Sequence, residues 1–205
     1  DKYIKTWDAY CSGSKHTITK FVPASGAASR MFKDLFGFLD ASYDVPTTPF
    51  EKTFFDNIEK FAFFGELDSA CLKNEGKSIK NLMADGRYKA VVSNLLGADG
   101  LNYGALPKGL LKFHKYAAAA RTPLEEHMAE GALYATGSDG SVHIHFTVSP
   151  EHKQLFKTLA EGCSRTLSKR YGTTYCISFS EQKPSTDTVA AAADGTPFRN
   201  DDGSI

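Results

Sequence analysis

The sequence FVPASGAASRMFK, residues 21–33, decides the fold that we expect for this chain. A short apolar run, Ile18 to Val22, leads into six small residues at 24–29, and the apolar face of a helix begins at Met31. This pattern predicts a strand that leads through a tight turn into a helix N-terminus, where free amides and the helix dipole stabilise phosphate. Small side chains let a polyanion approach the main chain, and Arg30 adds a planar guanidinium. We therefore interpret this segment as a cradle for a nucleoside triphosphate.

Composition limits the classes of function to consider. The chain has 205 residues, with 24 Lys and Arg against 24 Asp and Glu, so its formal net charge is zero. No overall field favours nucleic acid or an anionic membrane, and we expect neither as a partner. The sequence contains no long apolar run and no signal-peptide pattern, which favours a cytoplasmic location.

The four cysteines predict no metal or redox motif. They are widely spaced, without a C-x-x-C pair, and each lies among apolar neighbours, so we expect reduced thiols in the core. They are Cys11, Cys71, Cys163 and Cys176.

Hydrophobic periodicity predicts one helix before the small-residue turn and several after it. Residues 1–12 and the segment up to Leu39 have helical spacing. Residues 49–97 contain several further helical patterns and no convincing strand, so we interpret them as a helical insertion. Their phenylalanine stripe is more typical of a core than of a binding site.

From residue 106 onward, strand and helix patterns alternate. We expect strands at 110–116, 141–148 and 173–179. A helix should begin after Thr122, which offers an N-cap, a proline and a capping-box glutamate, and another should follow Ser149. This order predicts an α/β fold with a three-layer, open, mostly parallel sheet and helices on both faces, similar to the Rossmann fold. Ligands of such sheets bind at the carboxyl ends of the strands.

The small-residue turn is neither a Walker loop nor G-x-G-x-x-G, but it resembles a third motif. The segment ASGAASRM, residues 24–31, is similar to the A-G-G-x-G-T-R-M/L signature of nucleotidyltransferases that make nucleotide sugars. Ser25 and Ala28 stand where that family has glycine, and Ser29 stands where it has threonine. The resemblance implies that nucleotide is bound by Ala24, Ser25, Gly26, Ala27, Ala28 and Ser29.

Two further segments resemble parts of the same family. Residues 106–111, LPKGLL, look like the P-K-x-L/M-L segment that brings a lysine to the phosphates, which here is Lys108. Residues 122–127, TPLEEH, resemble the helix start that follows it. Gln182 stands after a strand, where that family has a glutamine that contacts the nucleobase.

The chain as a whole looks most like a bacterial family of domains of unknown function (type 4301) in the nucleotide-diphospho-sugar transferase superfamily. Residues 1–205 would then be the N-terminal part of one such domain, with the helical insertion at 49–97, in a longer protein. The resemblance implies transfer of a nucleotidyl group from a nucleoside triphosphate, with Mg²⁺, to a sugar 1-phosphate. Arg30 and Lys108 would be catalytic, and no protein metal ligand is assigned.

Two alternatives remain open. The chain could be a nucleotide-binding or sugar-nucleotide-binding module without catalysis, or an α/β interaction domain whose small-residue turn serves only for packing. The pair His143 and His145 lacks a third ligand of suitable spacing, so we interpret it as structural. We likewise expect Asp34, Asp40 and Asp44 to lie on a helix surface and its exit turn.

Overall fold

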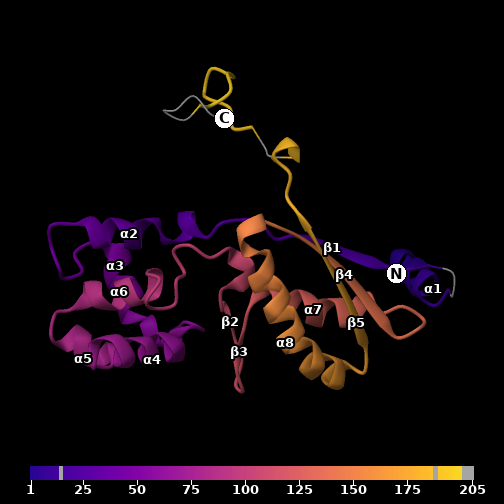
Figure 1. Ribbon diagram of the computed structural model, residues 1–205, viewed down its shortest axis with the longest axis horizontal. Helices are drawn as coiled ribbons and strands as arrows, with labels where there is room; N and C mark the ends of the chain where they lie inside the picture. Colours follow the sequence, from indigo (N-terminus) through magenta and orange to yellow (C-terminus); the bar gives the residue numbers. More distant parts are fainter. Residues whose placement is uncertain (14–15, 187–188, 200–205) are drawn as a thin grey trace.

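The computed structural model describes residues 1–13, 16–186 and 189–199. Its central element is a parallel sheet of three strands: β1 (Thr19–Pro23), β4 (Ser141–Val148) and β5 (Thr174–Glu181), in the order β1-β4-β5. In the register of the sheet, Phe21 lies beside His145, and His145 lies beside Ser178. The prediction of an α/β fold with a parallel sheet is confirmed (Figure 1).

Two helices cover one face of this sheet. They are α7 (Pro123–Tyr134) and α8 (Lys153–Tyr171). The capping box predicted at Thr122 is present, with the hydroxyl accepting from the Glu125 amide and the Glu125 side chain accepting from the Thr122 amide. The buried core between sheet and helices consists of Val22, Leu124, Met128, Val142, Ile144, Phe146, Val148, Phe156, Ala160 and Leu167.

No described helix covers the opposite face, so the predicted layer of helices on both faces is wrong. On this open face Phe21 is 64% exposed and stacks on the His145 ring, with centroids 5.5 Å apart. The two nitrogens of His145 lie 2.8 Å from the hydroxyls of Ser178 and Ser180. The open face is therefore a hydrogen-bonded polar surface, whereas the covered face is apolar.

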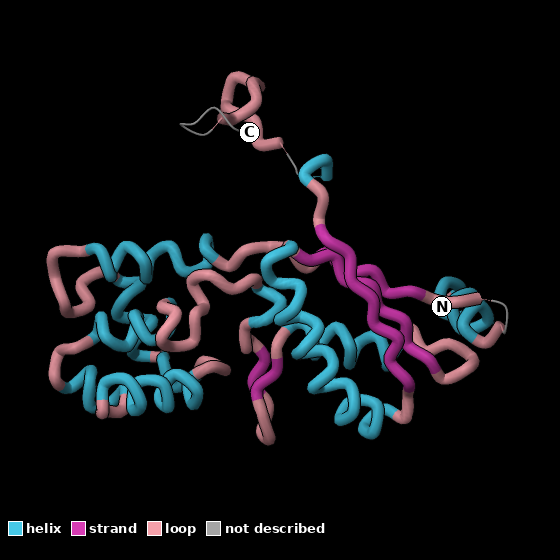
Figure 2. The backbone as a smooth tube through the Cα atoms, viewed as in Figure 1, coloured by secondary structure: helices cyan, strands magenta, loops and turns pink. Residues whose placement is uncertain are grey.

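The helices between the first strand and the second build a core of their own. Figure 2 shows them as a separate helical group beside the sheet. Its buried residues run from Ala28 to Leu111, so this helical unit includes the helix before residue 49 as well as those after it. The helices are α2 (Lys33–Asp40), α3 (Pro49–Asp56), α4 (Phe64–Glu75), α5 (Ile79–Ala84) and α6 (Tyr88–Leu96).

The predicted strand at 110–116 is largely wrong. Its first residues end a single 3-10 turn, Lys108–Leu110, and only β2 (His114–Lys115) is extended, pairing with β3 (Ala120–Arg121) in a short antiparallel hairpin. The reason is that Leu110 packs against the sheet core while Leu111 is buried in the helical unit, so the segment joins two cores. Further 3-10 turns occupy Ser29–Phe32, Ile58–Lys60, Pro150–His152 and Pro184–Thr186.

The N-terminal helix and the cysteines complete the fold. Helix α1 (Lys2–Cys11) forms as predicted, and the Trp7 indole donates to the Tyr134 carbonyl at 3.1 Å. All four cysteines are free thiols, as expected. Their expected burial in the core is confirmed only for Cys71, because Cys176 is exposed on the open face of the sheet. None of the described helices has the length and apolar character needed to cross a membrane.

A buried carboxylate in the helical unit yields a test of this fold. Glu51 is 3% exposed and accepts hydrogen bonds from the Thr47 amide at 2.7 Å, the Thr48 amide at 2.9 Å and the Tyr43 hydroxyl at 2.9 Å. Burial opposes its charge, but these hydrogen bonds outweigh burial and lower the pKa of Glu51. Its contribution to stability is therefore complete above the ordinary pKa and is lost as the pH falls through the lowered pKa.

We expect Glu51→Gln to lower the free energy of unfolding at pH 7 by about 1–3 kcal/mol, because it removes a charged acceptor from buried donors. In urea titrations from pH 7 to pH 3, the difference from wild type should shrink at acid pH, where the wild-type carboxylate becomes protonated. The exposed Glu59 provides the matched control Glu59→Gln, which should change stability little. A constant difference across the pH range would contradict this account.

Candidate functional site

The small-residue segment crosses from the sheet to the helical unit. At its start, the Ala24 amide donates to the Thr147 carbonyl at 2.7 Å, which extends the pairing of β1 with β4. At its end, Ala28 is 1% exposed and belongs to the core of the helical unit. The strand and the helical start that follows it are as predicted, but the tight turn between them is wrong, because residues 24–27 form no turn and cross to a second core.

Between these two anchors the main chain is available to a ligand. Gly26 and Ala27 are exposed, and in the described part of the chain no acceptor is bonded to the amides of Ser25, Gly26 or Ala27. Free backbone donors with small side chains beside them leave room for an anion to approach the main chain. This part of the predicted cradle is therefore compatible with phosphate.

Lys108 lies beside the cradle although it is distant in sequence. Its amide donates to the Gly26 carbonyl at 3.0 Å, and Ala27 and Pro107 form an isolated β-bridge. Gly109 follows so closely against α8 that a Cβ atom there would lie 2.8 Å from ring atoms of Phe156. The Lys108 side chain is exposed and forms no ion pair with any residue that the structure describes.

A small cavity of about 170 Å³ lies where these segments meet the sheet. The cradle contributes Ala24 and Gly26, the returning segment contributes Lys108, and α7 contributes His127 from its first turns. The floor is apolar and includes Phe146 and Phe156. The carboxyl end of β1 and the N-terminus of α7 meet here, but Glu125 and Glu126 occupy the first turn of α7, so the positive charge at the cavity comes from Lys108.

Sequence reasoning missed His127 as a residue of this cavity. Its Nδ1 lies 3.3 Å from Glu130 Oε2, and the same carboxylate pairs with Lys20 from β1. Burial, followed by the nearby Lys20 charge, lowers the pKa of His127, although Glu130 opposes the shift. The hydrogen bond from Lys20 is the main cause that lowers the pKa of Glu130. The only sequence signal was the place of His127 one turn after the Thr122 cap.

Gln182 lies on the other side of β1. It lines a cavity of about 450 Å³ on the open face, together with Phe21, Pro23 and Lys183. Its side-chain oxygen accepts a hydrogen bond from the Ser25 hydroxyl, so the end of β5 is attached to the cradle. Pro23 lines both cavities, which therefore flank the same end of β1.

Arg30 is separated from the small cavity. It lies in the 3-10 turn Ser29–Phe32 at the edge of the helical unit, is exposed, and does not line the cavity that contains Lys108. It forms no ion pair within the described ranges.

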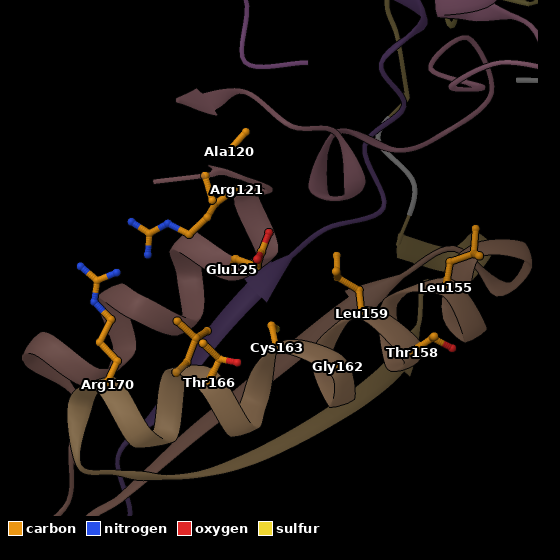
Figure 3. A pocket seen from close by; sticks show the side chains of 12 residues that line it. Ala120, Arg121, Glu125, Leu155, Thr158, Leu159, Gly162, Cys163, Thr166 and Arg170 are labelled. Atoms are coloured by element: carbon orange, nitrogen blue, oxygen red, sulfur yellow. The ribbon is translucent and has the colours of Figure 1, made fainter. Parts of the chain in front are cut away.

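A larger groove of about 660 Å³ runs along α8 and contains none of the predicted site residues (Figure 3). It is mostly apolar, with Arg121 and Arg170 at one end and Leu155 at the other. The charge of Arg121 is already compensated, since its Nε lies 2.8 Å from Glu126 and its guanidinium stacks on Tyr116 at 4.2 Å. We therefore do not include this groove in the candidate site.

The described residues do not offer a protein-held metal centre. No group of three or more His, Cys, Asp or Glu side chains could hold an ion in this part of the chain. His143 is engaged by the Ser141 hydroxyl at 3.0 Å, and Asp44 lies 3.4 Å from the Lys89 ammonium. The residues thus do not fit a Mg²⁺ ion bound by protein carboxylates alone.

Two glycines of the site allow a test of its packing. Gly109→Ala should lower the free energy of unfolding by about 1–3 kcal/mol, because the new methyl group meets the buried Phe156 ring. Gly26→Ala is the matched control, since a Cβ there meets nothing within 4 Å and stability should stay within about 0.5 kcal/mol. Urea unfolding measures both, and equal effects would refute the close approach at Gly109.

Comparison with known proteins identifies the family. Neither the search of curated proteins nor the search of solved structures finds a match. One family model matches the chain over residues 1–205, which is its whole length. The chain therefore belongs to the family described as Domain of unknown function (DUF4301).

Proposed function

We propose that this chain is the nucleotide-binding part of a sugar-phosphate nucleotidyltransferase-like domain. The observation that carries the proposal is the meeting of three segments, around residues 24–27, 107–109 and 182, at the carboxyl ends of parallel strands. They are separated by more than seventy residues in sequence, and each was selected from the sequence by its resemblance to a nucleotidyltransferase segment. In open parallel sheets this end is where ligands bind.

The phosphates would bind to the cradle. The free amides of Ser25, Gly26 and Ala27 offer hydrogen bonds without bulky side chains. Lys108 adds a compact mobile charge next to them, which suits a phosphate chain that changes its charge distribution during reaction. Magnesium would accompany the nucleoside triphosphate, as these residues provide no carboxylate set for it.

The nucleobase would bind on the open face near Gln182. A side-chain amide both donates and accepts hydrogen bonds, as the edge of a base requires, and its oxygen has a second lone pair besides the one that accepts from the Ser25 hydroxyl. Phe21 lines the same cavity and is exposed, so it offers an aromatic face for stacking. Base and phosphates would then lie on the two sides of the Pro23–Ala24 step.

In the proposed reaction an oxygen of the sugar 1-phosphate attacks the α-phosphorus of the nucleotide. A new P–O bond forms as the bond to the β-phosphate oxygen breaks, and pyrophosphate leaves with the electron pair. No covalent enzyme intermediate is needed, because positioning and electrostatic stabilisation suffice for an in-line displacement. Arg30 would stabilise the charge on the α-phosphate and the leaving pyrophosphate.

A non-catalytic nucleotide-binding module is the second candidate. Two observations favour it: the described residues contain no cluster of metal-binding carboxylates, and Arg30 does not line the cavity of Lys108. Such a module would bind nucleotide through the same cradle and release no pyrophosphate.

Lys108→Ala tests the nucleotide-binding site, which the catalytic and the non-catalytic candidates share. We expect wild type to be stabilised by at least one of UTP, GTP, ATP and dTTP with Mg²⁺ in thermal shift assays, because ligand binding stabilises the folded state. Lys108→Ala should weaken this nucleotide binding about tenfold or more, since it removes a charged partner of phosphate. Lys52→Ala, an exposed lysine on α3, is the matched control.

Arg30→Ala separates the two candidates. Pyrophosphate release from a panel of triphosphates and sugar 1-phosphates should occur in wild type and fall about a hundredfold in this variant, while Arg165→Ala retains it. Nucleotide binding without pyrophosphate release would favour the module. Absence of any nucleotide binding would overturn both candidates and leave the interaction domain.

A further inference from the structure

His127 combines three properties that the proposed function does not use. It lines the small cavity beside Lys108, its Nδ1 faces Glu130, and no partner of Nε2 exists in the parts of the chain that the structure describes. The ring is held in place, since Glu130 also pairs with Lys20 and the ring packs against Phe146 at 6.4 Å between centroids. A fixed imidazole whose Nε2 has no partner among the described residues thus lines the cavity.

The charges around His127 decide which hydrogen bond it can form. Glu130 is held ionised by Lys20, whose side chain is only 9% exposed and whose ammonium lies 5.0 Å from the Tyr134 ring centre. An ionised carboxylate only accepts, so Nδ1 must carry the proton that faces Glu130. Burial and Lys20 lower the pKa of His127, so the ring is neutral near pH 7. Nε2 is then a lone-pair acceptor, suited to a hydroxyl and unsuited to a phosphate oxygen.

We propose that the small cavity binds a phosphate ester that carries a hydroxyl group, with the phosphate at Lys108 and the hydroxyl donating to His127 Nε2, while the amides of Ser25 and Ala27, which do not line this cavity, remain for the nucleotide. This inference rests on the proposed function, because it assigns the sugar phosphate of that reaction to this cavity. A volume of about 170 Å³ equals the space of roughly six water molecules, which accommodates a phosphate and an adjoining hydroxyl-bearing carbon. The cavity would thereby distinguish polyol phosphates from other anions.

The test compares two phosphate monoesters by isothermal titration calorimetry at pH 7.5. Glucose 1-phosphate carries hydroxyls, and methyl phosphate carries none. We expect wild type to prefer glucose 1-phosphate, and His127→Phe to weaken glucose 1-phosphate about tenfold, since it removes the acceptor of the hydroxyl. The same variant should bind methyl phosphate within about twofold of wild type.

Three further variants keep the result interpretable. His127→Gln supplies an amide oxygen in place of Nε2 and should restore part of the preference. His143→Phe changes a histidine of the open face and should leave both affinities unchanged. Lys108→Ala should weaken both ligands together, and circular dichroism with thermal melting establishes that each variant is folded.

Two negative results of this calorimetry would contradict different parts of the proposal. If wild type binds neither ester, the anion site of the proposed function is wrong, and the role of His127 is wrong with it. If wild type binds both esters and Lys108→Ala weakens both, but His127→Phe weakens them equally or not at all, the hydroxyl contact is wrong while the phosphate site stands.

Discussion

The pairing of two crossing segments is the constraint on which the rest of this structure depends. The chain leaves the sheet at Ala24–Ala28 and returns at Leu106–Leu111, and the Lys108 amide donates to the Gly26 carbonyl where the two segments run side by side. Each crossing segment must reach from one hydrophobic core to the other. Small residues on one side and Gly109 on the other allow the backbones to approach each other and the Phe156 ring. The candidate site forms at the junction, which is the place where these two segments meet between the cores.

The position of the site between two cores explains its chemistry. Residues inside either core are engaged in packing, whereas the junction contains backbone donors that no regular element uses. Such junctions are common places for ligand cavities, because they are concave and combine an apolar floor with a few polar groups. Here the floor comes from the sheet unit through Phe146 and Phe156, and the lysine comes from the returning segment. Loss of the junction would therefore remove the cavity even if both cores stayed folded.

Local signals in the sequence predicted the elements better than their arrangement. The Thr122 cap and the strands of the sheet were readable, because hydrogen-bonded caps and alternating side chains depend on neighbouring residues. The exposure of one face of the sheet also has a signal in the sequence. In SVHIHFTV, residues 141–148, polar residues alternate with apolar ones, whereas strands buried on both faces are apolar throughout. The helical unit could not be placed, since its residues show only that they form a core, and not whether that core includes the sheet.

In the candidate site, too, single residues were predictable from the sequence, but the contacts between them were not. Residues 24–29, Lys108 and Gln182 were chosen because their segments resemble parts of one family, and nothing in their spacing says that the Gly26 carbonyl would accept from the Lys108 amide. His127 was overlooked because a histidine on a helix is ordinary; it becomes informative only when Glu130 and Lys20 are seen to fix its ring. Lys20 itself lies on β1, more than a hundred residues away, and its partner is on α7. The orientation of the His127 ring in the cavity thus depends on an ion pair between the sheet and helix layers, which connects the covered face of the sheet to the site.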